Sequence, residues 1–368
     1  MRLDDGDGLG GSGAADGGVP GGGSADGGPA GGESFRRQVK DAVTPRSAVL
    51  LLGVLALGVL FITSYAGAFH APKPKDVPVG VVAPAQVRGK VVDGLNGLPG
   101  SPLSARAAAS RAAAVDRIRD RRLDGALVVA PRGSTDLLLV ASGGGQSLSD
   151  AVRKVVTAAE RAEGRSVRTV DVAPADPQDA RGLSSFYLVV GWSVGGYLCA
   201  AILAVSYGSR PADQRRAVIR LGVLALHSIA LGVLGAVVIG PVLGALPGSV
   251  LGLAALGALV VAAAGATTFA FQGMLGILGI GMTVLVIVIA GNPSAGGAYP
   301  YPLLPPFWRE IGPALIPGAG TWTARSIAYF DGRAVTGPLL VLAAWAVGGA
   351  VLTLVFARIH KSDARRLV

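Results

Sequence analysis

The chain has 368 residues, of which 51% are hydrophobic and only 15% are charged. A soluble globular domain carries about 25% charged residues, so composition excludes an ordinary soluble protein. The formal net charge of +10 would also suit a nucleic-acid-binding protein. The basic residues, however, flank long apolar runs, which is the pattern of a membrane protein, and we expect no nucleic-acid partner. The single cysteine, Cys199, excludes an intrachain disulfide.

The N-terminal region precedes the first apolar run. Residues 1–33 are almost entirely Gly, Ala, Ser, Asp and Pro, which cannot bury enough apolar surface to offset chain entropy. They are predicted to form a disordered, Gly-rich cytoplasmic tail, more typical of a solvated linker than of a binding segment. In residues 34–46, Phe35, Val39 and Val43 recur at a spacing of four between basic side chains. This spacing predicts an interfacial amphipathic helix.

Six runs are apolar enough to cross a membrane, because about 20 apolar residues span roughly 30 Å of hydrocarbon. The predicted spans are Ser47–Phe69, Phe186–Val205, Leu221–Leu243, Val250–Phe271, Gly273–Ala290 and Pro338–Ala357. We place the turn between the fourth and fifth spans near Gln272 and Gly273. A cleaved signal peptide at 47–69 is disfavoured, since this run is longer than the apolar core of a signal. The last five spans form a membrane domain over residues 184–368.

Residues 70–183 are charge-rich and have the patterns of a small soluble α/β domain. Short apolar or alternating runs predict strands, and longer runs with helical spacing predict helices. The predicted strands are Val77–Val82, Ala126–Val129, Leu137–Val140 and Val167–Val172, and the predicted helices are Ser104–Arg122 and Leu148–Glu163. The fold class is therefore an α-helical integral membrane protein with six transmembrane helices and an α/β domain between the first two. We expect this domain to fold independently.

Basic clusters indicate the orientation in the membrane. They precede the first predicted span, separate the second from the third, and follow the sixth. With six crossings all three clusters lie on one side, and the positive-inside rule makes that side cytoplasmic. The sequence predicts a multi-pass protein of the plasma membrane with both termini in the cytoplasm and residues 70–183 outside.

Sites for chemistry are scarce. No Asp, Glu, Lys or Arg lies within the six predicted spans, which disfavours a proton-driven pump and a voltage sensor. His227 is interpreted as a hydrogen-bonded helix neighbour and not as a proton relay. The glycines of Gly143–Gly145 lack the lysine and the second half of a phosphate-binding loop, so a turn is expected there. The sequence therefore predicts no enzyme activity, no catalytic residue, no metal site and no cofactor.

Residues 291–337 form the most unusual segment. Seven aromatic residues suit a membrane interface. Five prolines between Pro302 and Pro317 prevent one continuous helix. The segment is predicted to be a re-entrant or interfacial outer loop, and the alternative is a cap packed under the α/β domain.

Four motifs carry a resemblance to a known family. GNPSAGG, PFWREIGPALIPGAG and RSIAYFDG in the outer loop, with SSFYLVVGWSVGGYL at Ser184–Leu198, resemble actinobacterial membrane proteins grouped with the type-two ATP-binding-cassette permeases, in the phage-infection-protein-like branch. An arginine-rich composition with abundant Ala, Gly and Val also suits an actinobacterial source. The acidic Gly-rich tail is not part of the family pattern. The loop residues that carry the resemblance are Asn292, Pro293, Ser294, Gly296, Gly297, Phe307, Trp308, Gly312, Pro313, Pro317, Arg325, Tyr329 and Phe330.

The resemblance implies a permease that pairs as a homodimer or with a similar permease, is driven by a separate ATP-binding-cassette ATPase, and exports lipids, glycans or drugs. It also implies a short cytoplasmic coupling helix between the second and third spans. YGSRPADQRRAVIR lies at that place, with Pro211 at the expected helix start and Asp213 in its first turn, where an acid suits the helix dipole. The candidate ATPase-coupling residues are Pro211, Asp213, Arg215, Arg216 and Arg220. Alternatively, these arginines only set topology and contact lipid headgroups.

The leading hypothesis is a permease-like subunit, with membrane lipids around it, that exports an amphipathic substrate. The competing hypothesis is a non-transporting surface scaffold or receptor whose outer domain binds a partner. A partner ATPase distinguishes the two.

Overall fold

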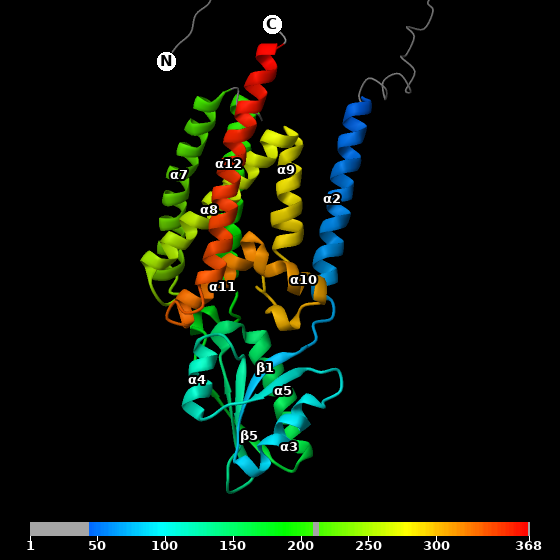
Figure 1. Cartoon of the computed structure of the whole chain (residues 1–368), viewed down its shortest axis with the longest axis vertical. Helices are drawn as coiled ribbons and strands as arrows, with labels where there is room; N and C mark the ends of the chain where they lie inside the picture. The colour runs from blue at the N-terminus through cyan, green and yellow to red at the C-terminus, as the bar shows by residue number, and fades with distance from the viewer. Residues whose placement is uncertain (1–43, 209–212, 367–368) are drawn as a thin grey trace, which may run out of the picture. The chain divides into compact units, whose positions relative to one another are not determined.

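The computed structural model describes residues 44–208 and 213–366. The chain divides into two compact units, Met1–Val54 and Leu55–Val368. Of the first unit only the opening turns of helix α2 are described, and the fold given below is that of the second (Figure 1). The expectations for residues 1–33 and 34–43 concern residues outside the described part of the chain.

In the described part of the chain, five helices are long and apolar enough to cross a membrane. They are α2 (Pro45–Phe69), α6 (Ser184–Tyr207), α7 (Gln214–Val237), α8 (Val250–Leu275) and α12 (Thr336–Arg366). Helix α7 continues into a π-helical segment, η3 (Val238–Val242). These five helices overlap five of the six predicted spans and are compatible with a membrane-embedded protein.

Helix α8 is the centre of the helical bundle and packs against α6, α7 and α12. Two glycines on neighbouring helices allow this close approach. A Cβ at Gly232 of α7 would lie 2.5 Å from the Ala258 backbone nitrogen of α8, and one at Gly349 of α12 would lie 2.6 Å from the Ala266 carbonyl carbon. Small residues have this role in bilayers, where apolar burial gives helices no drive to associate.

The fifth predicted span is placed differently. Helix α8 continues past Gln272, whose side chain is fully buried and donates to the Ala200 carbonyl oxygen of α6 at 3.3 Å. The chain turns only at Gly276, where φ is +62°. The following apolar helix, α9 (Leu278–Thr283) with the π-helical η4 (Val284–Gly291), is therefore shorter than the other five. The turn lies a few residues after the predicted position because the polar Gln272 side chain bonds within the bundle.

The α/β domain is a five-stranded sheet in the order β2-β1-β3-β4-β5. All neighbouring strands are parallel except β3 and β4. Apolar side chains of α3 and α5 cover one face, and those of α4 cover the other. The elements are β1 (Val77–Val82), α3 (Ala85–Asn96), β2 (Leu103–Ala107), α4 (Arg111–Arg119), β3 (Gly125–Val128), β4 (Thr135–Val140), η1 (Ser142–Gly144), α5 (Gln146–Ala162), β5 (Ser166–Asp171) and η2 (Pro177–Asp179).

The four predicted strands and the helix at 148–163 are confirmed within a few residues. The predicted helix at 104–122 was partly wrong, because its first residues form β2 and only Arg111–Arg119 is helical. Strand β2 buries Leu103 and Ala105 on one face. This alternation is hard to recognise in the sequence because Ala105 and Ala107 are only weakly hydrophobic. Helix α3 was missed because Gly89 and Gly94, both weak helix formers, interrupt its pattern.

Residues 291–337 contain short helices and one longer one. They are η5 (Tyr301–Leu303), α10 (Pro306–Ile311), η6 (Gly312–Ala314) and α11 (Ile316–Tyr329). Helix α11 packs against α6, α8 and α12, and also against η1 of the α/β domain. Two loop residues, Leu303 and Phe330, are part of the apolar cores of that domain. The domain core is therefore shared with the loop, which argues against the expectation that residues 70–183 fold alone.

Candidate functional site

The α/β domain and loop 291–337 meet in a polar contact that we call the docking interface. From the domain it takes Arg121, Asp179 and the Gly182 carbonyl, and from the loop it takes Trp322, Ser326 and the motif residues Gly296, Gly297, Arg325, Tyr329 and Phe330. A polar contact of this extent links the two parts of the chain mechanically.

Arg325 is the central loop residue of the docking interface. Its side chain is 3% exposed. One terminal nitrogen, Nη1, donates to the Gly296 carbonyl oxygen at 2.7 Å. The other, Nη2, donates to the carbonyl oxygens of Gly297 at 2.7 Å and Gly182 at 2.9 Å. A buried guanidinium needs such acceptors. Arg325 therefore ties α11, the 296–297 turn and the C-terminal end of the α/β domain together.

Arg121 is the matching residue on the α/β domain. It follows α4 in the left-handed region, with φ of +57°, a conformation that is unfavourable for a residue with a side chain. Its Nη1 donates to the Trp322 carbonyl oxygen at 2.8 Å and to Ser326 Oγ at 3.0 Å. Its Cζ lies 3.5 Å from the Trp322 ring centroid, a cation–π contact. These contacts with α11 stabilise the unusual backbone of Arg121.

Asp179 connects the interface to helix α6. Its Oδ2 accepts from the Tyr329 hydroxyl at 2.9 Å, and its Oδ1 accepts from the Ser184 backbone nitrogen, also at 2.9 Å. Ser184 is the first residue of α6, so the carboxylate lies at the positive end of a helix dipole. One carboxylate thus bonds the start of α6 and the end of α11.

The charges of the interface perturb each other. Burial, with a smaller contribution from Arg325, lowers the pKa of Arg121 below its ordinary value. Burial also raises the pKa of Asp124 to about 6, although the Arg121 charge opposes the rise. Both groups therefore lose hydration on docking, which limits the net stabilisation from their charges.

Gly143–Gly145, considered above as a phosphate loop, is in contact with the loop 291–337. A Cβ at Gly143 would lie 2.5 Å from Cγ of Tyr329, and one at Gly145 would lie 2.3 Å from Cγ of Pro300. These glycines let the loop pack directly on the turn before α5. Their place is filled by protein, which leaves no space for a phosphate.

The remaining motif residues shape the loop. Ser294 is fully buried and donates to the Ala290 carbonyl oxygen at 2.7 Å, while Asn292 is 6% exposed. Trp308 Nε1 donates to Ser64 Oγ of α2 at 3.2 Å, and Phe307 is 61% exposed. Pro293 follows Asn292 in the turn. Gly312 lies against the Ser294 carbonyl, and Pro317 lies against Gly291. Pro313 lines a groove described below. The family-like motifs thus hold one folded loop together.

The candidate coupling residues divide into two kinds. Asp213 is the N-cap of α7, and its Oδ1 accepts from the Arg216 backbone nitrogen at 2.9 Å. Arg215 and Arg216 are exposed in the first turn. Arg220 is 5% exposed and its Nη2 donates to the Gly208 carbonyl oxygen at 2.7 Å. Pro211 lies outside the described residues.

The expected helix start was therefore wrong. Helix α7 begins at Gln214 and runs unbroken into the bundle, so the charged segment is the first turn of a span and, within residues 213–237, not a separate helix. Of the candidate coupling arginines, Arg215 and Arg216 are exposed and Arg220 is buried.

Two grooves lie on the helical bundle, and the larger one shares Trp322 with the docking interface. One, of about 500 Å³, is lined by loop and α11 residues including Trp322 and by the start of α12, Thr336–Pro338. The other, of about 390 Å³, lies between α8 and α12 and is lined by apolar residues including Phe271, Trp345 and Gly348. Their linings adjoin at η6 and α12, through Pro313 and Ala314.

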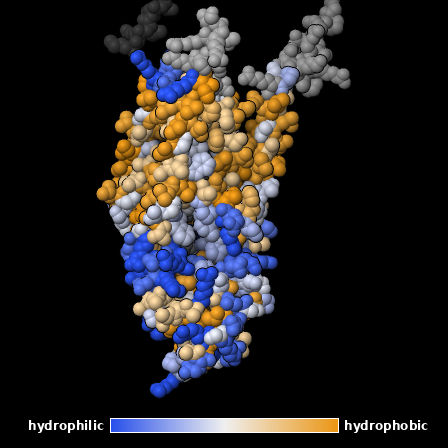
Figure 2. All heavy atoms as spheres, in the orientation of Figure 1, coloured by the Kyte–Doolittle hydropathy of each residue, from blue (hydrophilic) through white to orange (hydrophobic). Residues whose placement is uncertain are grey.

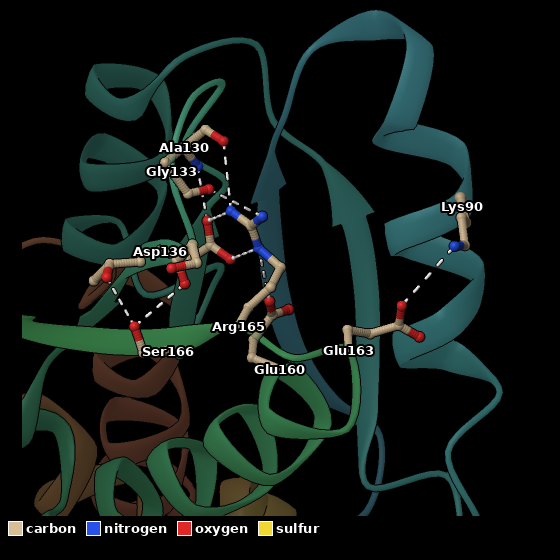
Figure 3. Close-up of polar contacts among 10 residues, drawn as sticks. Lys90, Ala130, Gly133, Asp136, Glu160, Glu163, Arg165 and Ser166 are labelled. Atoms are coloured by element: carbon tan, nitrogen blue, oxygen red, sulfur yellow. Dashed lines mark hydrogen bonds and ion pairs between the residues drawn. The ribbon is translucent and has the colours of Figure 1, made fainter.

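A carboxylate cluster in the α/β domain is structural. Figure 3 shows Asp136 facing Arg165, which donates to both of its carboxylate oxygens, while the Glu160 carboxylate lies beside the same Arg165 Nε at 3.6 Å. Asp136 is 1% exposed and also accepts from the Ala130 backbone nitrogen at 2.8 Å. Because both oxygens of Asp136 are engaged, this carboxylate holds the β3–β4 loop in place. Among the described residues no group of three His, Cys, Asp or Glu is arranged to hold a metal ion.

Comparison with known proteins gives no match to a protein-family model, a curated protein or a solved structure.

Sequence reasoning named Arg325, Tyr329 and Phe330 but missed Arg121 and Asp179. Arg121 belongs to the run RIRDRR, in which every arginine looks like a solvated surface residue. The one available signal was the apolar Leu123 and the predicted strand from Ala126 close behind it, which indicated that one of these arginines lies near a core.

Proposed function

We propose that this chain is a permease-like membrane subunit that exports an amphipathic substrate and is energised by a separate ATP-binding-cassette ATPase. The observation that carries the proposal is the position of Trp322. Its backbone carbonyl and ring bind Arg121 of the α/β domain, while its side chain also lines the larger groove on the bundle. A movement of α11 would therefore change the groove and the docking interface together, as alternating access requires.

Six crossings fit the contacts of the short helix α9–η4. Just before it, at the end of α8, a Cβ at Gly273 would lie 3.0 Å from Cβ of Phe356, in the C-terminal half of α12. At its end, a Cβ at Gly291 would lie 2.8 Å from Pro317, at the start of α11. Residues 278–291 thus return the chain toward the α/β domain. An even number of crossings supports the proposal that both termini lie in the cytoplasm.

The resemblance of the loop motifs to phage-infection-protein-like members of the type-two permease group supports the same proposal. In such an assembly two permease subunits, of one or two kinds, pair with two ATPase subunits in the plasma membrane. The exposed Arg215 and Arg216 at the start of α7 are the proposed ATPase contact, and the inward-facing Arg220 is not part of it.

The test is affinity purification of the full chain in mild detergent from the cells that make it, followed by identification of co-purifying proteins. We expect an ATP-binding-cassette ATPase with the native chain and at least a tenfold loss with Arg215→Ala combined with Arg216→Ala. The matched control removes two exposed arginines of the α/β domain, Arg161→Ala with Arg168→Ala, and should retain the ATPase. If no ATPase accompanies the native chain, the proposal fails and the surface-receptor hypothesis replaces it.

A further inference from the structure

The two grooves form an apolar path along one side of the bundle. Lining residues pass from Trp322 and Gly337, near the α/β domain, to Trp345, Gly348 and Leu352 further along α12. A helix surface in a bilayer is in contact with lipid hydrocarbon. A groove of this lining and length therefore suits an acyl chain lying along α12.

The end of the path near the α/β domain is rich in arginine. Figure 2 shows hydrophilic side chains gathered over α4 and the turn between α11 and α12, directly beside the apolar surface of the helices. Arg333 in this turn precedes the groove residue Ala334, and its Nη1 lies 3.1 Å from Asp120 Oδ1 at the end of α4. Arg119 and Arg122 are exposed on either side of Asp120 and Arg121 along the chain.

The acids at this end do not neutralise all of the arginines. Asp120 forms an ion pair with Arg333, and the charge of Asp124 interacts with that of Arg121. The guanidinium groups of Arg119 and Arg122 have no carboxylate within ion-pair distance among residues 44–208 and 213–366.

Asp331 is exposed in the α11–α12 turn. Its single carboxylate could balance the charge of only one of the two guanidinium groups, Arg119 or Arg122. Free guanidinium groups with planar donor pairs favour phosphate and carboxylate ligands.

We infer that the path is a binding site for an anionic membrane lipid, with the acyl chain along α12 and the charged headgroup at Arg119 and Arg122. The two halves of the site come from independent observations: an apolar groove, and the arginines Arg121 and Arg333 at one end of it, next to which Arg119 and Arg122 are exposed along the chain. An uncharged lipid or a helix of a second copy would use the groove but would leave the arginines unused. If the chain is an exporter as proposed, an anionic lipid is its class of substrate. The role as substrate rests on the proposed function, whereas lipid binding does not.

The test uses the quenching of tryptophan fluorescence by brominated lipids. The full chain with Trp308→Phe, in phosphatidylcholine nanodiscs, receives equal mole fractions of dibrominated phosphatidylglycerol or dibrominated phosphatidylcholine. Trp322 and Trp345 line the grooves and report occupancy, whereas Trp192 is 1% exposed within the bundle. We expect stronger quenching by the anionic lipid.

Arg119→Gln with Arg122→Gln should abolish this preference, with about a fivefold loss of relative affinity for each arginine. The control Arg161→Gln with Arg168→Gln removes two exposed arginines that do not flank the groove, and should keep the preference.

A second pair of variants tests the groove itself. A Cβ at Gly337 meets no atom within 4 Å, so Gly337→Leu fills the groove without a clash. Gly222 on α7 has the same free space but lies outside both grooves, which makes Gly222→Leu the matched control. Gly337→Leu should lose quenching by the anionic lipid, and Gly222→Leu should not.

Equal quenching by both lipids in the native chain would overturn the inference in favour of an unselective lipid groove. No quenching by either would overturn it in favour of a groove covered by protein. If the native chain prefers the anionic lipid but no ATPase co-purifies with it, the proposed function alone is rejected. If an ATPase co-purifies but the native chain shows no lipid preference, the lipid site alone is rejected.

Discussion

Arg121→Gln removes one of the contacts of the α/β domain with α11. The substitution loses two donated hydrogen bonds, at 2.8 and 3.0 Å, and a guanidinium 3.5 Å above the Trp322 ring. A charged hydrogen bond contributes about 1.5–3 kcal/mol and a desolvated cation–π contact about 2 kcal/mol. Burial has already lowered the pKa of Arg121, so part of this gain offsets lost hydration. We expect a net loss of about 2–4 kcal/mol from the docking interface.

Two measurements on the full chain in detergent check this prediction. Intrinsic fluorescence during heating should give a lower unfolding temperature for Arg121→Gln. Hydrogen exchange should rise at Ser142–Gly144 and at the C-terminal turn of α11, which meet in the interface. Arg117→Gln, at an exposed position of α4, is the control and should change stability by less than about 0.5 kcal/mol. Equal, small effects of both substitutions would show that Arg121 does not hold the domain to α11.

Three further outcomes are expected. Phe330→Ala should lower the free energy of unfolding by about 3–5 kcal/mol in thermal unfolding, because the Phe330 side chain is 2% exposed in the domain core. Phe307 is 61% exposed, so Phe307→Ala should have little effect. Similar losses of stability in both variants would contradict a shared core. Burial and a neighbouring carboxylate raise the pKa of Glu160, so the folded state binds its proton more tightly and stability falls as pH rises from about 4.3 through that raised pKa. Glu160→Gln should flatten this slope, and an unchanged slope would exclude Glu160 as its source. In a Cys199→Ala background, a membrane-impermeant thiol reagent on whole cells should label a cysteine placed at Ser101 and not one at Ser362, and the reverse pattern would invert the orientation.

The helical bundle was largely predictable because lipid makes hydrophobicity decisive. The runs at 186–205, 250–271 and 338–357 each lie within an observed helix. The exception came from Gln272, a polar residue interpreted as a turn signal that instead bonds to α6 inside the bundle. Such a bond depends on a neighbour 72 positions away, which no local pattern contains.

The docking interface was only partly predictable. Motif resemblance pointed to Arg325 and Tyr329, and both lie in the interface. Arg121 could not be distinguished from the other arginines of its run, because its role depends on an α11 carbonyl about 200 positions later. The same holds for Arg220, whose inward direction depends on the end of α6 at Gly208.

If a separate ATPase drives this chain, as proposed, ATP hydrolysis should accompany the purified chain. The chain is purified in mild detergent from the cells that make it and passed over a size-exclusion column, and each fraction is assayed for vanadate-sensitive hydrolysis. We predict hydrolysis that co-elutes with the chain and is lost with Arg215→Ala combined with Arg216→Ala. A chain that elutes in fractions without hydrolysis would contradict the account.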